Sequence, residues 1–308
     1  MIHLMDFTKR YGGLVAVDRL NLTIDRGETF GFIGPNGAGK STTIRFLATL
    51  LNPTRGDGTV NGYSVTRRPL DVRRSIGYMP DAFGVYEGMN VGQFLEFFAE
   101  AYRVPRERRA KVIGGVLERV GLSLKRSASL GGLSRGMKQR LCLAKTLLHD
   151  PPVLILDEPA SGLDPRARVE MKSLLRELRE SGKTILISSH ILSELADSCT
   201  TVGIIERGKL LLHGPIEEIY RRLGRKRVLE IRLLDPIEAG LEILRSEPNL
   251  TVVQTDDGAV TVELEADDRQ LAELLQRLVT QGARVLSFAE KELSLEEVFL
   301  RVTNGVVG

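Results

Sequence analysis

The stretch GPNGAGKS, residues 34–41, restricts the possible folds of this chain more than any other feature of its sequence. It follows the apolar stretch ETFGFI, residues 28–33, which has the composition of a short buried strand. A GxxxxGKS/T sequence between a strand and a helix forms a loop whose backbone N–H groups converge on a phosphate group. We expect that helix to begin near Lys40, and its dipole strengthens anion binding. The stretch therefore predicts a phosphate-binding loop in an α/β domain. The alternative, a Gly-rich surface turn, would not require a strand before it and a helix after it.

The side chains of this loop have separate expected tasks. Lys40 reaches the terminal phosphates of a nucleotide, and the Ser41 hydroxyl can bind Mg²⁺. A dinucleotide fingerprint would require the spacing GxGxxG, which this stretch lacks. The residues expected to bind the nucleotide are Gly34, Pro35, Asn36, Gly37, Ala38, Gly39, Lys40, Ser41 and Thr42.

A second stretch, VLILDEPASGLDP at residues 153–165, places two carboxylates at the end of an apolar strand. A strand buried on both faces does not end in Asp157 and Glu158 without a cationic or reactive group beside them. If this strand lies beside the strand that leads into the phosphate loop, Asp157 contacts the Mg²⁺ held by Ser41. Glu158 then faces the attacking water as a general base. Alone, the two residues could equally begin a surface loop, but together with the phosphate loop they favour catalysis.

Sequence periodicity divides residues 1–224 into three parts. Residues 1–80 are rich in short strands, and the next part, about residues 85–150, has helical spacing and predicts a helical subdomain. Asn90 and Gln93 have the spacing of a capping box at the start of its first helix. Strands and helices then alternate as βαβ units, which predicts a largely parallel sheet. The expected strands are 153–157, 184–189 and 201–208, and the expected helices are 165–180 and 190–197.

The remainder, residues 225–308, differs in its pattern and is expected to form a separate accessory α+β domain. Its elements follow the βαββαβ order of a ferredoxin-like unit, and a short amphipathic helix is expected at residues 294–303. This tail contains no group of acids, histidines or phosphate-loop glycines that could catalyse, so we expect it to regulate or dock. The expected strands are 228–234, 251–255, 259–265 and 283–289, and the expected helices are 236–247 and 269–281.

Composition excludes several classes of protein. The net charge of +3 comes from 43 basic and 40 acidic residues, so it indicates no basic stripe for nucleic acid. The two cysteines, Cys142 and Cys199, lie in dissimilar segments, which indicates a reducing compartment and no disulfide. No apolar stretch approaches the roughly 20 residues that a membrane helix requires, and residues 1–13 lack the apolar core of a signal peptide. Any role at a membrane would therefore depend on a partner.

A third stretch connects these features. It is LSRGMKQR, residues 133–140, which precedes a helix; by itself, Ser134 is an ordinary N-cap of that helix. The helix leads into the strand that ends in Asp157 and Glu158, and SGLDP follows that strand. The combined pattern resembles the ATP-binding subunits of ABC transporters, whose signature LSGGQ precedes the Walker B strand and whose D-loop follows it. The resemblance covers residues 1 to about 220. It implies the fold of the P-loop ABC ATPase core with a helical subdomain.

The resemblance also implies roles for three further residues. Tyr11 stands where the family stacks an aromatic ring on adenine, although a lone Tyr near a strand is more often packing. His190 stands at the switch histidine, which contacts the γ-phosphate and supports the catalytic water; alternatively, it begins a helix capped by Ser189. Asp164 matches the D-loop aspartate, but Asp-Pro is equally an ordinary N-cap. Glu158 and His190 are thus the expected catalytic residues.

In this family, a second subunit docks head to tail and closes the phosphate site. Ser134 and Gly136 of its signature are then the expected donors to the γ-phosphate. ATP holds the two subunits together, and hydrolysis releases them. This sequence departs from the family at Arg135 and Met137, which replace Gly and Gln of the signature, and at Asp81, which replaces the Gln of the Q-loop. We expect Asp81 to join the Mg²⁺ shell; alternatively, it only forms a turn.

The resemblance implies an ATPase subunit on the cytoplasmic face of a membrane, working as a homodimer, or with a similar subunit, beside a transmembrane permease. The loop YMPDAFGVYEG and the ending SLEEVFLRV resemble ABC-2 type exporters, and the substrate path would lie in the permease. An alternative is a soluble ABC ATPase acting on DNA or ribosomes, but the chain lacks both a long heptad coiled coil and a second cassette. A catalytically weak scaffold is disfavoured because Lys40, Asp157, Glu158 and His190 are present. We expect ATP and Mg²⁺ as cofactors and no nucleic-acid partner.

Overall fold

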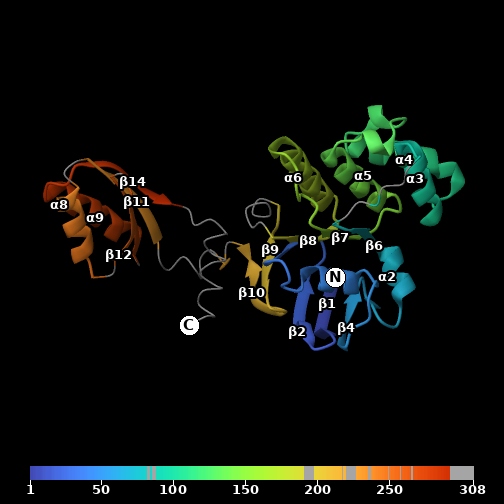
Figure 1. The fold of residues 1–308 in the computed structure, drawn as a ribbon, viewed down its shortest axis with the longest axis horizontal. Coiled ribbons are helices and arrows are strands. Elements are labelled where there is room, and N and C mark those ends of the chain that lie inside the picture. Colours follow the sequence, from blue (N-terminus) through green and yellow to red (C-terminus); the bar gives the residue numbers. More distant parts are fainter. Residues whose placement is uncertain are drawn as a thin grey trace. The chain divides into compact units, whose positions relative to one another are not determined.

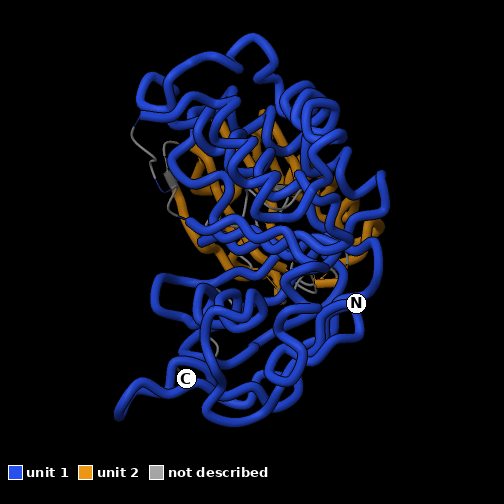
Figure 2. Tube along the Cα trace, turned by 90° about the vertical axis from the view of Figure 1, so that its right-hand side faces the viewer, with its two compact units in different colours: residues 1–216 blue, residues 217–308 orange. Residues whose placement is uncertain are grey.

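The computed structural model describes residues 1–81, 84, 88–190, 198–216, 218–219, 227–234, 237–248, 250–256, 258–264 and 266–291. The chain divides into two compact units, residues 1–216 and residues 217–308, which Figure 2 colours separately. The predicted boundary between residues 224 and 225 lies outside the described residues. The same holds for the predicted helix after His190 and the predicted helix at residues 294–303.

A six-stranded sheet forms the centre of the first unit, with the strand order β10-β9-β3-β8-β7-β6. The strands from β9 to β6 are parallel, and β10 pairs antiparallel with β9 at one edge. This confirms the predicted largely parallel sheet. The strands are β3 (Thr29–Ile33), β6 (Ile76–Met79), β7 (Val153–Asp157), β8 (Thr184–Ser189), β9 (Thr201–Glu206) and β10 (Lys209–Pro215).

The condition stated for Asp157, that its strand lies beside the strand leading into the phosphate loop, is not met. The strand that ends in Asp157 is β7, and β8 lies between it and β3, the strand that leads into the phosphate loop. Each of these three strands is buried along its whole length, so the burial pattern fits any interior position of the sheet. The order is decided instead by the crossover connections, which belong to the tertiary structure.

A four-stranded sheet, in the order β2-β1-β4-β5, packs against helix α1 (Lys40–Leu47). Phe7 of β1 stacks on Phe46 of α1, with ring centroids 4.2 Å apart and an interplanar angle of 10°. Both rings are fully buried and share one hydrophobic core with Phe30 and Phe32 of β3. This core fixes α1, and with it the end of the phosphate loop, on the central sheet. The strands are β1 (Ile2–Tyr11), β2 (Leu14–Ile24), β4 (Arg55–Val60) and β5 (Tyr63–Ser64).

Helices α3 to α6 lie on the side of the central sheet opposite to β1, β2 and β4 (Figure 1). The predicted capping box is confirmed, because Asn90 Oδ1 accepts from the Gln93 N–H at 2.8 Å and Gln93 Oε1 accepts from the Asn90 N–H at 2.9 Å. No helix among the described residues combines the length and hydropathy needed to cross a bilayer. The helices are α2 (Pro69–Ser75), α3 (Val91–Ala101), α4 (Arg106–Arg119), α5 (Arg135–Leu147) and α6 (Pro165–Glu180), with short 3₁₀ turns at Ser123–Lys125 and Leu130–Gly132.

The second unit contains a four-stranded antiparallel sheet in the order β12-β13-β11-β14. Helices α8 and α9 cover one face of it, and the hydrophobic core of this unit lies between them and the sheet (Figure 1). The described elements follow the predicted βαββαβ order of a ferredoxin-like unit. They are β11 (Arg227–Leu233), α8 (Glu238–Ser246), β12 (Leu250–Asp256), β13 (Ala259–Leu264), α9 (Asp268–Thr280) and β14 (Val285–Lys291).

Candidate nucleotide-binding site

The phosphate loop, residues 34–39, connects β3 to α1 and leaves no space for a side chain at two of its glycines. A Cβ at Gly34 would lie 2.2 Å from the carbonyl oxygen of Ile205 in β9. A Cβ at Gly39 would lie 2.7 Å from the carbonyl oxygen of Ala16, and Gly39 also has a φ of +109°. Only glycine fits both positions without a clash. These contacts fix the path of the loop at the N-terminus of α1, the end of a helix that attracts anions.

Lys40 begins α1, and its side chain turns back into the loop. Lys40 is 5% exposed, and its Nζ donates to the carbonyl oxygens of Gly34 at 2.6 Å and Pro35 at 3.2 Å. Burial lowers the pKa of Lys40, while the nearby carboxylates of Glu158 and Asp157 oppose that shift. The loop thus encloses a lysine at the place where a bound phosphate would meet it.

Asp157 ends β7 and lies across β8 from the loop, yet it reaches Ser41. The Ser41 hydroxyl donates to Asp157 Oδ1 at 3.4 Å, and the Ser188 hydroxyl of β8 donates to the same oxygen at 2.6 Å. Burial raises the pKa of Asp157, which is 2% exposed, and these two hydrogen bonds oppose the rise. The charges of Asp81 and Glu158 act in the same direction as burial. Asp157 and Ser41 therefore meet, although their strands are not neighbours.

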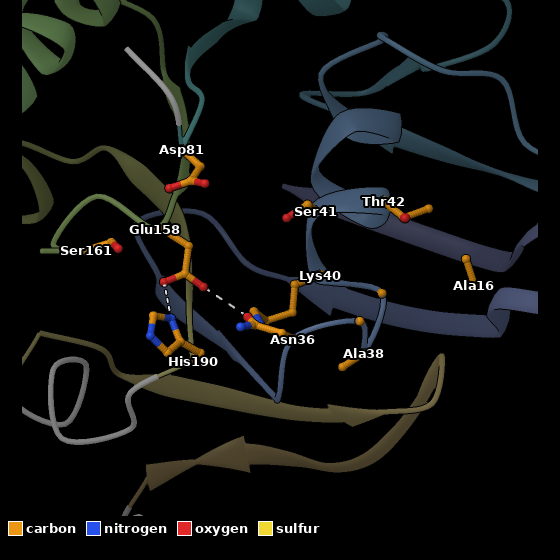
Figure 3. A pocket seen from close by; sticks show the side chains of 12 residues that line it. Ala16, Asn36, Ala38, Lys40, Ser41, Thr42, Asp81, Glu158, Ser161 and His190 are labelled. Atoms are coloured by element: carbon orange, nitrogen blue, oxygen red, sulfur yellow. Dashed lines mark hydrogen bonds and ion pairs between the residues drawn. The ribbon is translucent and has the colours of Figure 1, made fainter.

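Glu158 has a φ of +51°, a left-handed conformation that costs a non-glycine residue about 1 kcal/mol. Its N–H donates to Ser188 Oγ at 3.0 Å. Its carboxylate lies between two side chains, with Oε2 2.7 Å from Nδ1 of His190 and Oε1 3.8 Å from Nζ of Lys40 (Figure 3). The Glu158 side chain is only 12% exposed. A carboxylate held in this way can accept a proton from a water molecule at the mouth of the loop.

The side chains of Lys40, Ser41 and Glu158 line one cavity of about 330 Å³, a volume typical of small-molecule sites, whereas Asp157 is not among its lining residues (Figure 3). The cavity joins the phosphate loop to Asp81, Glu158 and His190, which are far apart in the sequence. Asp81 is exposed and lies two residues beyond the end of β6. The lining residues are Ala16, Asn36, Gly37, Ala38, Gly39, Lys40, Ser41, Thr42, Asp81, Glu158, Ser161 and His190.

The oxygen atoms at this site suit Mg²⁺, which prefers oxygen ligands. Ser41, Asp157 and Asp81 offer one hydroxyl and two carboxylates beside the loop. Within the described ranges, no cluster of three or more His, Cys, Asp or Glu side chains could hold a metal by itself. Mg²⁺ usually binds through one or two carboxylates together with substrate phosphates, so this set of donors fits a metal that arrives with a nucleotide.

Tyr11 does not line this cavity. It ends β1 and is 49% exposed, and the Lys9 ammonium lies 5.1 Å from the centroid of its ring. This cation–π contact occupies one face of the ring. The predicted stacking of Tyr11 on adenine stays a prediction and would use the opposite face.

Ser134, Gly136 and Asp164 also lie outside the lining of the cavity. Ser134 caps α5 by accepting a hydrogen bond from the Met137 N–H at 3.2 Å, and Asp164 caps α6 by accepting one from the Ala167 N–H at 2.8 Å. A Cβ at Gly136 would lie 3.1 Å from the Cβ of Ala167, so the starts of α5 and α6 are in contact. The helix-cap interpretations of Ser134 and Asp164 are confirmed, and the family roles of all three residues stay predictions.

Arg135, a departure from the family signature, packs on the stretch SGLDP. A Cβ at Gly162 would lie 2.3, 2.5 and 2.6 Å from Cζ, Nη1 and Nη2 of Arg135. Three nearly equal distances mean that the guanidinium lies face-on over Gly162, which has a φ of +64°. The preceding residue, Ser161, lines the cavity. The first turn of α5 therefore contacts the segment beside the site, a link that the sequence did not predict.

Sequence reasoning missed Ser188 and Ser161. Ser188 contacts both Asp157 and Glu158, and Ser161 lines the cavity. The only sequence signal for Ser188 was the stretch TILISSH, in which an apolar strand ends in two serines. A buried serine at a strand end usually satisfies the local backbone, so this signal did not indicate a site.

Comparison with known proteins finds a matching family model for each of the two units. The family model described as ABC transporter matches residues 17–161, which include the phosphate loop, the signature and Glu158. The family model described as ATP-binding protein DrrA1-3-like, C-terminal domain, matches residues 214–303. The two models together cover most of the chain.

Two relatives align along nearly the whole chain. The bacitracin transport ATP-binding protein BcrA of Bacillus licheniformis is 36% identical over 309 residues, covering 99% of this chain and 98% of the relative. The daunorubicin/doxorubicin resistance ATP-binding protein DrrA of Streptomyces peucetius is 36% identical over 301 residues, covering 96% of this chain and 90% of the relative. A solved dimeric ATP-binding cassette in a post-hydrolysis state, bound to ADP and Pi, is 25% identical, with a TM-score of 0.64, and covers 70% of this chain and 99% of that chain. The chain therefore belongs to the ATP-binding proteins of ABC transporters.

Proposed function

We propose that this chain hydrolyses ATP as the nucleotide-binding subunit of an ABC exporter. The observation that carries the proposal is the position of Glu158, whose carboxylate contacts His190 and Lys40 at the mouth of the phosphate loop. A module that only bound ATP would need no carboxylate at that place. Purified with its membrane partner, the chain should release Pi from ATP, and a complex that binds ATP without releasing Pi would contradict the assignment.

The geometry supports a task for each group. Lys40 and the loop would bind the terminal phosphates of ATP, and Ser41 and Asp157 would hold Mg²⁺, which neutralises phosphate charge when bound. A water molecule attacks the γ-phosphorus and the bond to the β–γ bridging oxygen breaks, which yields ADP and Pi. Glu158 accepts the proton of that water. His190 is hydrogen-bonded to Glu158 through Nδ1, so it would orient the carboxylate, and it would contact the γ-phosphate of bound ATP.

A second copy of the chain would close the phosphate site. Ser134 and Gly136 at the N-terminus of α5 do not line the cavity of their own subunit, so they would serve ATP bound to the partner. Asp164 would lie at the same interface, and Tyr11 would stack on adenine. A related ATP-binding cassette that was solved as a dimer supports the association of two copies.

The membrane partner is inferred from the relatives. BcrA is named for bacitracin transport and DrrA for daunorubicin/doxorubicin resistance, which supports an exporter whose permease binds this chain at the cytoplasmic face. Affinity purification from solubilised membranes should recover a protein with several membrane-spanning helices. Recovery with ribosomes or DNA instead would contradict the exporter.

Removal of residues 228–308 should leave ATP affinity within about 3-fold and change dimerisation or coupling to the permease. The physical reason is that every described residue lining the cavity belongs to the first unit, which has its own hydrophobic core. ATP titration and light scattering measure the two effects. Loss of ATP binding in a truncated protein that still unfolds cooperatively would contradict this accessory role for the tail.

Asp81→Gln should raise basal ATPase activity and weaken stimulation by the permease. Asp81 lines the cavity and adds negative charge near Asp157. Its side chain is one methylene shorter than that of glutamine, so Asp81 would have to approach a bound Mg²⁺ more closely to join its shell. Asp81→Asn keeps the size and removes the charge, so it separates charge from reach. ATPase assays in vesicles, with and without the permease, measure both the basal activity and its stimulation. If both variants match the parent under both conditions, Asp81 is only a turn residue.

A further inference from the structure

Ser188 lies inside the central sheet, near the carboxyl end of β8, and is fully buried. Its hydroxyl group makes two hydrogen bonds. It donates to Oδ1 of Asp157 at 2.6 Å, and it accepts from the backbone N–H of Glu158 at 3.0 Å. One side chain therefore contacts both residues of the acidic pair at the end of β7.

The bond to Glu158 lies where the ladder between β7 and β8 ends. The last paired residues of that ladder are Asp157 and Ser188. Beyond them, Glu158 adopts its φ of +51°, and its N–H is bound by a side chain instead of a strand. This conformation directs the Glu158 carboxylate toward His190 and Lys40 (Figure 3). Without the Ser188 hydroxyl, the strained residue would lose the partner of its N–H.

The bond to Asp157 acts on the other carboxylate. The Ser188 and Ser41 hydroxyls both donate to Oδ1 of Asp157, at 2.6 and 3.4 Å, so Ser188 is the closer partner. In the part of the chain that the structure describes, no hydrogen bond is made to Oδ2 of Asp157. The two hydroxyl groups thus engage Oδ1, and Oδ2 would be the oxygen left for a cation.

We propose that Ser188 is a positioning residue for ATP hydrolysis, which holds the metal-facing and the water-facing carboxylates in one fixed arrangement. The inference rests on the proposed function. Ser188 does not line the cavity, so it acts through Asp157 and Glu158. A serine with a merely structural role would stabilise β8 and leave turnover unchanged.

Ser188→Ala removes both hydrogen bonds, and Ser188→Thr retains a hydroxyl. For Ser188→Ala we expect kcat to fall about 10- to 100-fold and KM for ATP to change less than about 3-fold, because misplaced carboxylates slow the chemistry more than they weaken binding. Ser188→Thr should recover kcat to within about 5-fold of the parent. If Ser188→Ala does not fold, Ser188→Cys has nearly the same size with a weak donor and should show the same loss.

Thr184→Val is the matched control. Thr184 lies at the other end of β8, is fully buried, and accepts the N–H of Gly27 at 2.9 Å, so its loss also removes a buried hydroxyl partner. Thr184→Val should lose thermal stability to a similar extent and keep the kcat of the parent. An equal loss of kcat in Thr184→Val would overturn the inference, because it would indicate general destabilisation of the sheet. A parental kcat in Ser188→Ala would overturn it as well.

Equilibrium binding of ATP tests the same residue without turnover. When Mg²⁺ is chelated, Ser188→Ala and the parent should bind ATP alike. When Mg²⁺ is present, the increase in ATP affinity that it causes should be about 2- to 3-fold smaller in Ser188→Ala than in the parent. If Mg²⁺ increases the ATP affinity of both proteins equally, Ser188 does not act through Asp157. Glu158→Gln distinguishes a failure of the proposed function from a failure of this inference. Full ATPase activity in Glu158→Gln would show that Glu158 is not the general base. Loss of activity in Glu158→Gln together with parental activity in Ser188→Ala would contradict only the role of Ser188.

Discussion

Glu158→Gln is expected to slow ATP hydrolysis by roughly 100-fold or more while ATP binding stays close to that of the parent. The substitution keeps the size of the side chain and removes its ability to accept a proton from water. Lys40, Ser41 and Asp157, which we propose to hold the phosphates and the metal, keep their hydrogen bonds to Gly34 and to each other. Because ATP would then bridge two subunits without being consumed, dimers should accumulate with ATP.

Glu28→Gln is the control for Glu158→Gln. Glu28 lies beside the amino end of β3, and its carboxylate accepts hydrogen bonds from Thr201 and from the N–H of Asp25, so a partly buried charge is removed at the opposite end of the sheet. Its ATPase rate should stay within about 2-fold of the parent. Pi release and light scattering measure the outcome. Normal turnover in Glu158→Gln, or a variant that stays monomeric with ATP, would show that the assigned role of Glu158 is wrong.

Lys40→Met is expected to weaken ATP binding by about 100-fold or more, and hydrolysis at fixed ATP should fall with it. Methionine retains most of the apolar volume of the lysine but has no charge and no donor. The Lys40 ammonium is nearly buried, and an ion pair between a buried ammonium and a phosphate is costly to lose. Titration calorimetry with ATP measures the change in Kd.

Lys183→Met provides the comparison for Lys40→Met. Lys183 is also buried, at 9% exposure, and forms an ion pair with Asp150, but it does not line the cavity. Its substitution removes a buried lysine charge in the same unit, so it should cost stability and leave the Kd for ATP within about 2-fold. Parental affinity in Lys40→Met, or an equal loss in both variants, would mean that Lys40 does not bind the phosphates.

The sequence by itself determined the local parts of this protein. GPNGAGKS predicted a loop between a strand and a helix, and β3 and α1 flank it as expected. The capping box of Asn90 and the start of α6 at Asp164 and Pro165 were equally predictable. The patterns that predicted these features lie within eight or fewer consecutive residues, so they can be recognised without knowing which distant segments meet. The parallel sheet and the βαββαβ unit followed from periodicity for the same reason.

Only the tertiary structure decided how these parts meet. Three strands that are buried along their whole length look alike in sequence, so nothing in it placed β8 between β3 and β7. The same strand order brings Ser188 to Asp157 and Glu158, which are 31 and 30 residues away along the chain. Contacts at such separations leave no periodic pattern in a sequence, because they depend on which strands become neighbours. The left-handed backbone of Glu158 depends in turn on those contacts, and it sets the direction of the carboxylate.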